Sequence, residues 1–470
     1  MQMLTLIQNT AIMKHMQSDK LSSWFSQIKK AFHWDIRWLA PGLGVKRWVG
    51  IILAGTTLVA VGFAVLLLDI YRNAPQTWWL PIISALSLRF LDRTLRAVVF
   101  GGAGVLLILW GSWGLNQALL KPFVRPGKDI LQAVTDYRKR DKGPRIVVIG
   151  GGTGLSALLR GLKLHTSNLT AIVTVADDGG SSGELRKNMG VLPPGDIRNC
   201  LAALSNDETL LTQIFQYRFS SATGLNGHTL GNLLITALTD LTGSFEEAVA
   251  ETGRVLAVQG RVLPATLHDV KLVAQIRKGK NSESIQVKGE SQIPKTLGKV
   301  ERVWLEPNNP KAFPPVIQAI LSAELIVIGP GSLYTSLLPN LLVPDIADAL
   351  KASRALKFYI CNVATQPGET DGYLCGDHIS TIEKHLGRRL VDLVICNHRF
   401  EGELPPDGPE WVQMEPDLAE RYSVYSADLI DVANPWRHDS VKLAQVVLDL
   451  YYERTGPLMA RESYPFINPN

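Results

Sequence analysis

The spacing of apolar residues divides this chain into regions with different structures. From residue 144 to 455, short β-branched apolar runs alternate with longer stretches in which apolar residues recur every three or four positions. The short runs predict strands at Arg145–Ile149, Thr170–Val175, Leu325–Ile328, Lys357–Ile360 and Leu390–Ile395. The longer stretches predict helices at Leu155–Leu162, Ile197–Leu204, Glu208–Tyr217, Leu230–Thr239 and Phe245–Val255. This alternation predicts an α/β domain with a Rossmann-like, doubly wound, mostly parallel sheet.

Two segments, one inside this region and one after it, depart from the alternation. Residues Asp269–Pro294 alternate apolar and polar side chains, which predicts a β-hairpin excursion or a small subdomain. Residues 456–470 contain three prolines and no periodic apolar pattern, so we expect a disordered tail.

The N-terminal part contains two long uncharged runs, Trp48–Leu68 and Ala97–Leu120. Each is long enough to cross a hydrocarbon core of about 30 Å as a helix. We therefore predict two transmembrane helices within residues 48–120, joined by a short extracytoplasmic loop. They follow an arm of residues 1–47 and precede a charged stalk of residues 121–143.

Lysine and arginine predict the orientation of these helices. The arm and the stalk are rich in both residues, whereas the loop between the two runs carries only Arg72, Arg89, Arg93 and Arg96. The positive-inside rule then places both termini in the cytoplasm. We expect a multi-pass protein of the plasma membrane whose main domain, residues 144–455, is cytoplasmic.

Composition argues against a nucleic-acid partner and against a cysteine-based metal or redox site. The net charge of +5 on 470 residues, without a basic stripe or interleaved aromatic residues, argues against a nucleic-acid partner. The four cysteines are widely spaced and match no metal-binding or redox motif, so buried reduced thiols are the default expectation.

The run after the first predicted strand has the pattern of a phosphate cradle. Glycines let backbone N–H groups approach an anion, and a helix that starts there presents its positive end. The candidate ligand residues of this turn are Gly150, Gly151, Gly152, Thr153 and Gly154. Gly152, Gly154 and Ala157 also fit a dinucleotide fingerprint, with Asp177 at the ribose position, so an NAD-dependent oxidoreductase is one alternative. A tight turn without a ligand is another.

The second predicted strand ends in a polar loop with four candidate ligand residues, Asp177, Asp178, Ser181 and Ser182. Such a loop can bind anions, sugar hydroxyls or a hydrated cation. The paired aspartates are candidates for Mg²⁺, which takes one or two carboxylates together with phosphate oxygens. We name no other cofactor.

Two further loops precede predicted helices. In the first, Asp196 can cap the helix, and Arg198 can pair with a phosphate beside Asn199, although a structural cap with a solvated arginine is equally consistent. In the second, His228 and Asn232 favour a ligand-lining loop over the alternative of a buried histidine with its own partners.

Two more strand ends carry candidates. The first repeats the strand, glycine and helix-start pattern and contributes Gly329, Gly331, Ser332, Tyr334 and Thr335. Two such loops in one sheet could hold two phosphates, or a phosphate and a sugar. At the second strand end, the amides of Asn362 and Gln366 could bind hydroxyls or a base edge, and simple turn chemistry is the alternative.

Taken in order, these segments resemble the gluconeogenesis-factor (YvcK-like) family within the CofD-like superfamily. The motifs that carry the resemblance are GGGTGLS, TVADDGGSSG, PPGDIRN, GHTLGN, GPGSLYTS, PNLLVP and CNVATQPGET. They extend over about Arg145–Asp449. The resemblance implies a Rossmann-like core that binds UDP-sugars, notably UDP-N-acetylglucosamine. It also implies a role in cell shape and wall synthesis during growth on gluconeogenic carbon sources.

The resemblance further implies ligand contacts from Tyr422 and Arg437, and as partners a UDP-sugar, cell-wall synthesis proteins and a second copy of the chain. The membrane helices depart from the usual soluble member of this family. The expected function is a nucleotide-sugar-binding regulator without turnover. The alternative is an enzyme similar to the phospholactate transferases of the superfamily, which use a GDP-linked donor and a divalent cation.

Overall fold

The computed structural model describes residues 143–205, 210–220, 224–279, 283–405 and 408–456, with a few scattered positions between 53 and 108. The chain divides into two compact units at residue 138, and the fold below is that of the second unit. The predicted arm, membrane helices, stalk and tail fall outside these ranges, apart from the scattered positions, Gly143 and Gly456. Among the residues described, no helix combines the length and the apolar character that a membrane span requires.

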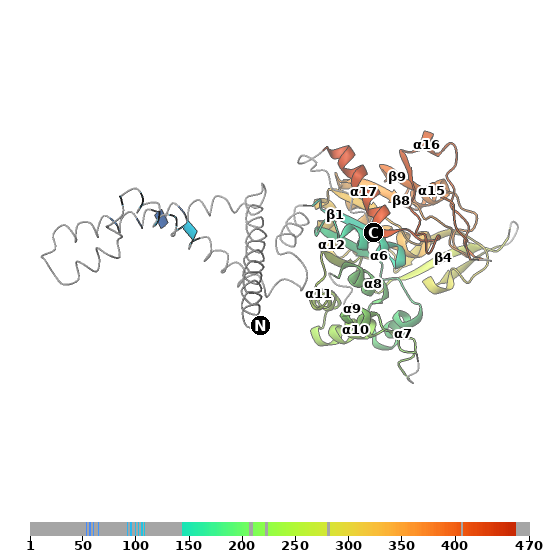
Figure 1. The fold of residues 1–470 in the computed structure, drawn as a ribbon. Coiled ribbons are helices and arrows are strands. Elements are labelled where there is room, and N and C mark those ends of the chain that lie inside the picture. Colours follow the sequence, from blue (N-terminus) through green and yellow to red (C-terminus); the bar gives the residue numbers. More distant parts are fainter. Residues whose placement is uncertain are drawn as a thin grey trace, which may run out of the picture. The chain divides into compact units, whose positions relative to one another are not determined.

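Seven parallel strands form the central sheet (Figure 1). In chain order they are β1 (Ile146–Gly150), β2 (Leu169–Val173), β3 (Arg261–Pro264), β7 (Leu325–Ile328), β8 (Leu356–Ile360), β9 (Leu393–Asn397) and β10 (Val424–Ala427). Their order across the sheet is β10-β9-β8-β7-β1-β2-β3. The predicted doubly wound α/β domain with a parallel sheet is therefore confirmed.

The strand order reverses direction between β1 and β7. The chain proceeds outward from β1 through β2 to β3, then returns to place β7 on the other side of β1. In open α/β sheets, ligands bind outside the carboxyl ends of the strands at such a switch point. The turns that follow β1 and β7 are the two glycine turns that the sequence singles out.

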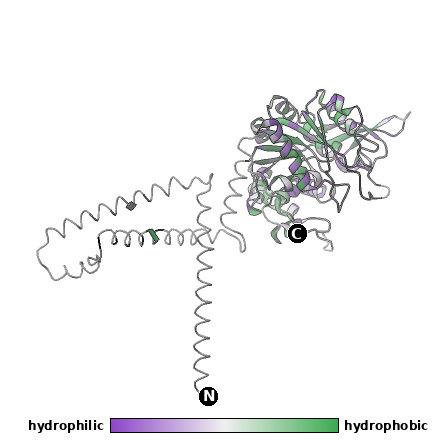
Figure 2. Cartoon of the chain, turned by 45° about the horizontal axis from the view of Figure 1, so that its top comes forward, coloured by the Kyte–Doolittle hydropathy of each residue, from purple (hydrophilic) through white to green (hydrophobic). Residues whose placement is uncertain are grey.

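Helices connect the strands and cover the sheet. The helix α6 (Gly152–Leu162) packs against α8 (Gly195–Leu204) and α17 (Ser440–Thr455). The helix α12 (Pro314–Ser322) packs against α14 (Pro344–Ala352). Gly161 lets α6 approach closely, because a β-carbon there would overlap the carbonyl group of Ser440. Figure 2 shows hydrophobic and hydrophilic residues interleaved along the helices of this domain, as expected for amphipathic helices.

The remaining described helices lie in the connections. They are α7 (Gly180–Met189), α9 (Leu210–Gln216), α10 (Leu230–Thr242), α11 (Phe245–Val255), α13 (Leu338–Leu341), α15 (Cys375–Leu386) and α16 (Leu418–Arg421). A 3₁₀ turn, η3 (Glu290–Gln292), and a π-helical turn, η4 (Leu333–Leu337), complete the set.

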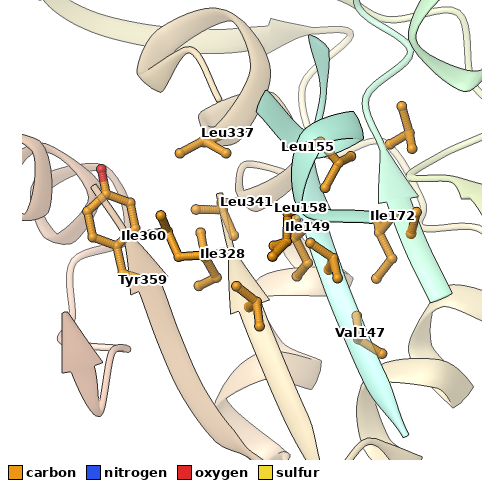
Figure 3. Packing of buried hydrophobic residues seen from close by; sticks show 14 of the residues in the cluster. Val147, Ile149, Leu155, Leu158, Ile172, Ile328, Leu337, Leu341, Tyr359 and Ile360 are labelled. Atoms are coloured by element: carbon orange, nitrogen blue, oxygen red, sulfur yellow. The ribbon is translucent and has the colours of Figure 1, made fainter. Parts of the chain in front are cut away.

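The hydrophobic core lies between the sheet and these helices. Ile149 on β1 and Ile328 on β7 are fully buried, as are Leu155 on α6 and Leu337 on η4 (Figure 3). Burial of one such side chain contributes about 1.5–3 kcal/mol. Because the core reaches the first turns of α6 and η4, the glycine turns rest on a rigid base.

A second sheet follows β3. It has three antiparallel strands in the order β5-β4-β6, with β4 at Lys271–Arg277, β5 at Ser284–Lys288 and β6 at Lys299–Glu306. The predicted hairpin excursion, Asp269–Pro294, contains β4 and β5 but stops before β6. The sequence therefore identified the hairpin and missed the third strand.

Element boundaries also differ from the prediction. The strand expected from Leu390 begins at Leu393, and Asp392 just before it accepts a hydrogen bond from the backbone N–H of Lys357. The strand expected to end at Val175 ends at Val173. In the described residues, the helix expected from Glu208 starts at Leu210.

Candidate ligand-binding site

The two glycine turns touch each other at the carboxyl edge of the sheet. A β-carbon on Gly154 would lie 2.9 Å from the carbonyl oxygen of Pro330, and one on Gly331 would lie 3.3 Å from the carbonyl oxygen of Gly151. Gly152 has a φ of +67°, a conformation that glycine adopts without strain. The structure thus brings together the turn Gly150–Gly154 and the turn Gly329–Ser332, as the switch point requires.

Two asparagines hold these turns in place. Asn340 is fully buried and its Nδ2 donates to the carbonyl oxygens of Gly150, at 3.0 Å, and Ser336, at 2.7 Å. The amide of Asn362 pairs with Gly331 in both directions, with 3.0 Å from Nδ2 to the carbonyl and 3.3 Å from the backbone N–H to Oδ1. Because their backbone is fixed before a ligand arrives, the turns lose little conformational freedom on binding.

Two aspartates lie beside the first turn. A β-carbon on Gly151 would lie 2.5 Å from Oδ2 of Asp196, which shows how closely that carboxyl group approaches the turn. Burial, together with the nearby charge of Asp177, raises the pKa of Asp196 to about 6. Burial also raises the pKa of Asp177, although its carboxylate accepts a 2.8 Å hydrogen bond from the backbone N–H of Gly179.

Two glutamates that the sequence analysis did not select join these aspartates. Glu369 Oε1 accepts a 3.0 Å hydrogen bond from Thr335, and burial raises the pKa of Glu369 to about 7. Burial, and next the charges of Asp177 and Asp196, raise the pKa of Glu290 well above its ordinary value. Oε2 of each glutamate is buried and has no hydrogen-bond partner among the described residues.

Both glutamates lie in segments that the sequence pattern marks. Glu369 belongs to the quoted motif CNVATQPGET, in which only Asn362 and Gln366 were selected. Glu290 lies in η3, inside the segment predicted as an excursion from the sheet. A carboxyl group with a raised pKa can donate a proton to a ligand oxygen at neutral pH, whereas an ionised carboxylate accepts from sugar hydroxyls.

The paired aspartates face different neighbours. Asp177 lies near Ser182 and Gly195, whereas Asp178 Oδ1 accepts a 2.8 Å hydrogen bond from the backbone N–H of Ser291 beside the second sheet. Within the described ranges, no three histidine, cysteine, aspartate or glutamate side chains are placed to hold one metal ion. Mg²⁺ at this pair therefore stays a prediction that depends on oxygens from a bound ligand.

Arg198 lies at the start of α8 between the first turn and the loop before α10. Its Nη1 donates to Thr229 Oγ1 at 2.5 Å and its Nη2 donates to Asn199 Oδ1 at 2.7 Å. Its Nε is buried and finds no hydrogen-bond acceptor in the described part of the chain. A buried donor of this kind costs free energy until an acceptor arrives, which fits a phosphate oxygen of a ligand.

Ser181, Ser182, His228 and Asn232 form one connected group. Ser182 Oγ accepts from the backbone N–H of Gly195 at 3.1 Å. Ser181 Oγ lies 2.9 Å from Nδ1 of His228 and receives a 3.0 Å hydrogen bond from Asn232 Nδ2. Ser182 also hydrogen-bonds the carboxylate of Asp177, and Arg198 donates to Thr229, the neighbour of His228, so these residues connect the group to Asp177 and Arg198.

Other predicted site residues are placed differently. Tyr334 is 1% exposed and its hydroxyl contacts the Tyr373 hydroxyl at 2.7 Å, so it packs in the core below the second turn. Thr153 is exposed at the first turn, Ser332 precedes η4, and Gln366 follows β8. Arg437 is exposed, next to His438, whose Nε2 lies 3.2 Å from the carbonyl oxygen of Cys361 just after β8.

Tyr422 lies away from this group. It immediately precedes β10, so it sits at the amino edge of the parallel sheet, opposite the glycine turns. There its hydroxyl donates to Glu383 Oε2 at 2.7 Å, and the guanidinium of Arg389 lies 4.6 Å from the centre of its ring. The structure does not bring Tyr422 to the candidate site.

Three cysteines that are distant in sequence meet where β8 and β9 end and α15 begins: Cys361, Cys375 and Cys396. The sulfur atoms of Cys375 and Cys396 lie 2.7 Å apart. Hydrogen bonds from Cys361 and Cys375 lower the pKa of Cys396 to about 5. All four cysteines are free and buried, as expected, but their wide spacing in the sequence concealed this cluster.

Known proteins share this domain. Residues 146–424 match the family model described as 2-phospho-L-lactate transferase CofD. A putative gluconeogenesis factor from Nostoc sp. is 44% identical over 450 residues, which cover 92% of this chain and 94% of that protein. The gluconeogenesis factor of Bacillus subtilis is 45% identical over 318 residues, covering 66% of this chain and 99% of that protein.

A solved structure agrees with the fold. A crystal structure of a protein from Bacillus halodurans is 46% identical, with a TM-score of 0.60, and covers 65% of this chain and 99% of that one. The match to the Nostoc protein is longer and must include much of the N-terminal region, because the described domain begins only at residue 143.

Proposed function

This chain belongs to the CofD family, with relatives named gluconeogenesis factor, and from that premise we propose that its glycine turns bind a UDP-sugar, UDP-N-acetylglucosamine. The observation that carries the proposal is the contact between Gly154 and Pro330 at the switch point. It places two glycine turns side by side at the carboxyl edge of the sheet, where the start of α6 presents the positive end of a helix.

The surrounding side chains suit such a ligand. The unpartnered Nε of Arg198 supplies a donor for a phosphate oxygen. The buried carboxyl groups of Asp196 and Glu369 supply acceptors, or donors when protonated, for sugar hydroxyls. We assign the diphosphate to the glycine turns and Arg198, and the sugar to the carboxyl groups.

We further propose a regulatory role in cell shape and wall synthesis during growth on gluconeogenic carbon sources. In this proposal the protein is anchored in the plasma membrane by helices within residues 48–120 and its ligand domain faces the cytoplasm. The Lys and Arg distribution around the two uncharged runs supports this topology. Binding of the nucleotide sugar would report the supply of wall precursors to synthesis proteins at the membrane.

Titration calorimetry of the full-length chain in detergent tests the binding proposal. We expect heat and saturation with UDP-N-acetylglucosamine and none with NAD. Saturation with NAD and not with the UDP-sugar would contradict the proposal and favour the oxidoreductase alternative.

A transferase similar to the matched family description is the second candidate. The observation that favours it is the group of carboxylates at the turns, because phosphoryl transfer enzymes use carboxylates with Mg²⁺. In the same calorimeter, GDP binding that requires Mg²⁺ and exceeds UDP-sugar binding would favour this candidate.

A further inference from the structure

A chain of hydrogen bonds joins α7 to the loop before α10. Ser181 Oγ lies 2.9 Å from His228 Nδ1, and His228 Nε2 lies 3.1 Å from Glu184 Oε2. Ser181 and His228 are each 8% exposed, whereas the carboxylate of Glu184 reaches solvent. These three groups form a serine, histidine and carboxylate relay that binding alone does not require.

The hydrogen-bonding partners of His228, Ser181 and Glu184, determine which of its ring nitrogens carries the proton. A neutral imidazole has one N–H donor and one acceptor nitrogen. Nε2 faces a carboxylate, which only accepts, so Nε2 carries the proton and Nδ1 accepts from Ser181. Asn232 Nδ2 donates to Ser181 Oγ at 3.0 Å, which leaves the serine hydroxyl proton for His228. The serine oxygen is therefore polarised toward deprotonation.

We propose that Ser181 is a nucleophile with His228 as its general base and Glu184 as the residue that orients the imidazole, and that it attacks the diphosphate of the bound nucleotide sugar. This rests on the proposed function, because the glycine turns must hold the substrate. In the serine proteases Nε2 accepts from the serine and Nδ1 donates to the carboxylate. Here Nδ1 accepts from Ser181 and Nε2 donates to Glu184, so both roles are filled by the opposite nitrogens.

Two further features would stabilise the charge that develops during attack. Ser181 is the second residue of α7, so it lies at the helix end where backbone N–H groups lack intrahelical partners and carry partial positive charge. Arg198 donates to Thr229, the neighbour of His228, and keeps its buried Nε without an acceptor among the described residues.

The proposed reaction is hydrolysis in two steps. Ser181 Oγ attacks the uridine-side phosphorus, an Oγ–P bond forms, and the anhydride P–O bond breaks. The serine proton passes to His228 and from there to the departing sugar phosphate. Water then attacks the uridylyl-serine, His228 accepts a proton from that water, and Ser181 regains its proton as UMP leaves. The sum is UDP-sugar plus water giving UMP plus sugar phosphate.

The test is to incubate the full-length chain in detergent with UDP-N-acetylglucosamine and to quantify UMP by chromatography. We expect release by the parent protein and a loss of about 100-fold or more in Ser181→Ala and His228→Gln, the usual range for a general base. Glu184→Gln should lose less. Acid quenching should trap a uridylyl mass increase on the peptide that contains Ser181.

Binding is measured in parallel, so that a failure of the Ser181 nucleophile can be distinguished from a failure of the proposed UDP-sugar binding. We expect Ser181→Ala still to bind the UDP-sugar, because the glycine turns and Arg198 hold the diphosphate, while it loses UMP release. Binding without UMP release, or equal release by Ser181→Ala and the parent, would overturn the nucleophile and leave the proposed function intact. Absence of binding would overturn both.

A matched control is His165→Gln, since His165 follows α6 at the amino edge of the sheet and has no place in the relay. It should release UMP at the parent rate. If Ser181→Ala does not fold, the parent protein alone tests the covalent step. Quenched parent samples without a uridylyl mass increase on the Ser181 peptide would contradict that step.

Discussion

Gly154 and Pro330, 176 positions apart, are in backbone contact: a β-carbon on Gly154 would lie 2.9 Å from the Pro330 carbonyl oxygen. The absence of a side chain at this one position lets the turn after β1 close against the turn after β7. Without that contact the two turns could not line one ligand site.

Gly154→Ala should therefore separate the turns. We expect it to lower the free energy of unfolding by about 1–3 kcal/mol, the usual cost of overpacking, and to weaken UDP-sugar binding. Chemical denaturation and calorimetry measure the two effects. Gly253→Ala in α11 is the matched control, because a β-carbon there meets only ordinary contacts, 3.7 Å from Leu201 and 3.8 Å from Val258, so it should leave binding unchanged. Equal affinities for both variants would contradict the role of the contact.

The buried carboxyl groups predict a specific pH dependence. The pKa of Asp196 is raised from 3.8 to about 6 and that of Glu369 from 4.5 to about 7, chiefly by burial. Between about pH 4 and pH 7 the folded protein therefore holds more protons than the unfolded chain, so the free energy of unfolding should fall as pH rises through this window.

Denaturation curves at several pH values check this dependence. Asp196→Asn combined with Glu369→Gln should flatten the fall. UDP-sugar binding should also weaken as the parent protein loses these protons, since the ionised carboxylates repel the diphosphate. If the double variant keeps the parent's dependence of unfolding free energy on pH, groups other than Asp196 and Glu369 titrate in this window.

Arg437 and Arg198 should respond differently to truncation. Arg437 is exposed, and its guanidinium has no hydrogen bond or ion pair within the described part of the chain. Arg437→Ala should weaken UDP-sugar binding by about tenfold or more, as expected for loss of a charge-assisted bond, with no change in Tm. Arg198→Ala should weaken binding and also lower Tm, because Thr229 and Asn199 lose their donor. Equal affinity of Arg437→Ala and the parent would refute its ligand role.

The cysteine cluster predicts a reversible oxidation. Because the Cys375 and Cys396 sulfurs lie 2.7 Å apart and the pKa of Cys396 is lowered to about 5, a diazene dicarboxamide oxidant should convert this pair to a disulfide. Thiol titration of the denatured protein should then count two thiols fewer, and dithiothreitol should restore them. Cys200→Ser should not alter this loss, whereas Cys375→Ser should abolish it. An unchanged thiol count after oxidation would contradict the prediction.

The predicted membrane anchor is tested by fractionation. With spanning helices in residues 48–120, the protein should stay in the pellet through a carbonate wash, and protease outside intact spheroplasts should spare the domain beyond Pro144. A chain that starts at residue 140 is the control and should appear in the supernatant. Release of the full chain by carbonate would contradict the anchor, and digestion of the domain would contradict the orientation.

The sequence by itself determined the elements whose signals are local. The strands β1 and β7, the glycine turns after them and the caps of α10 and α11 follow from β-branched runs, glycine conformational freedom and short-range hydrogen bonds. Such signals involve residues a few positions apart, so they are visible without the fold.

The tertiary structure decided which of these local elements meet. Strands of a parallel sheet have similar buried sequences, so nothing local states that β1 pairs with both β2 and β7, or that Tyr422 falls at the opposite edge from the glycine turns. Glu290 and Glu369 look like ordinary polar residues until burial raises their pKa. Burial and contact depend on the packing of the whole domain, because they arise from segments that are distant along the chain.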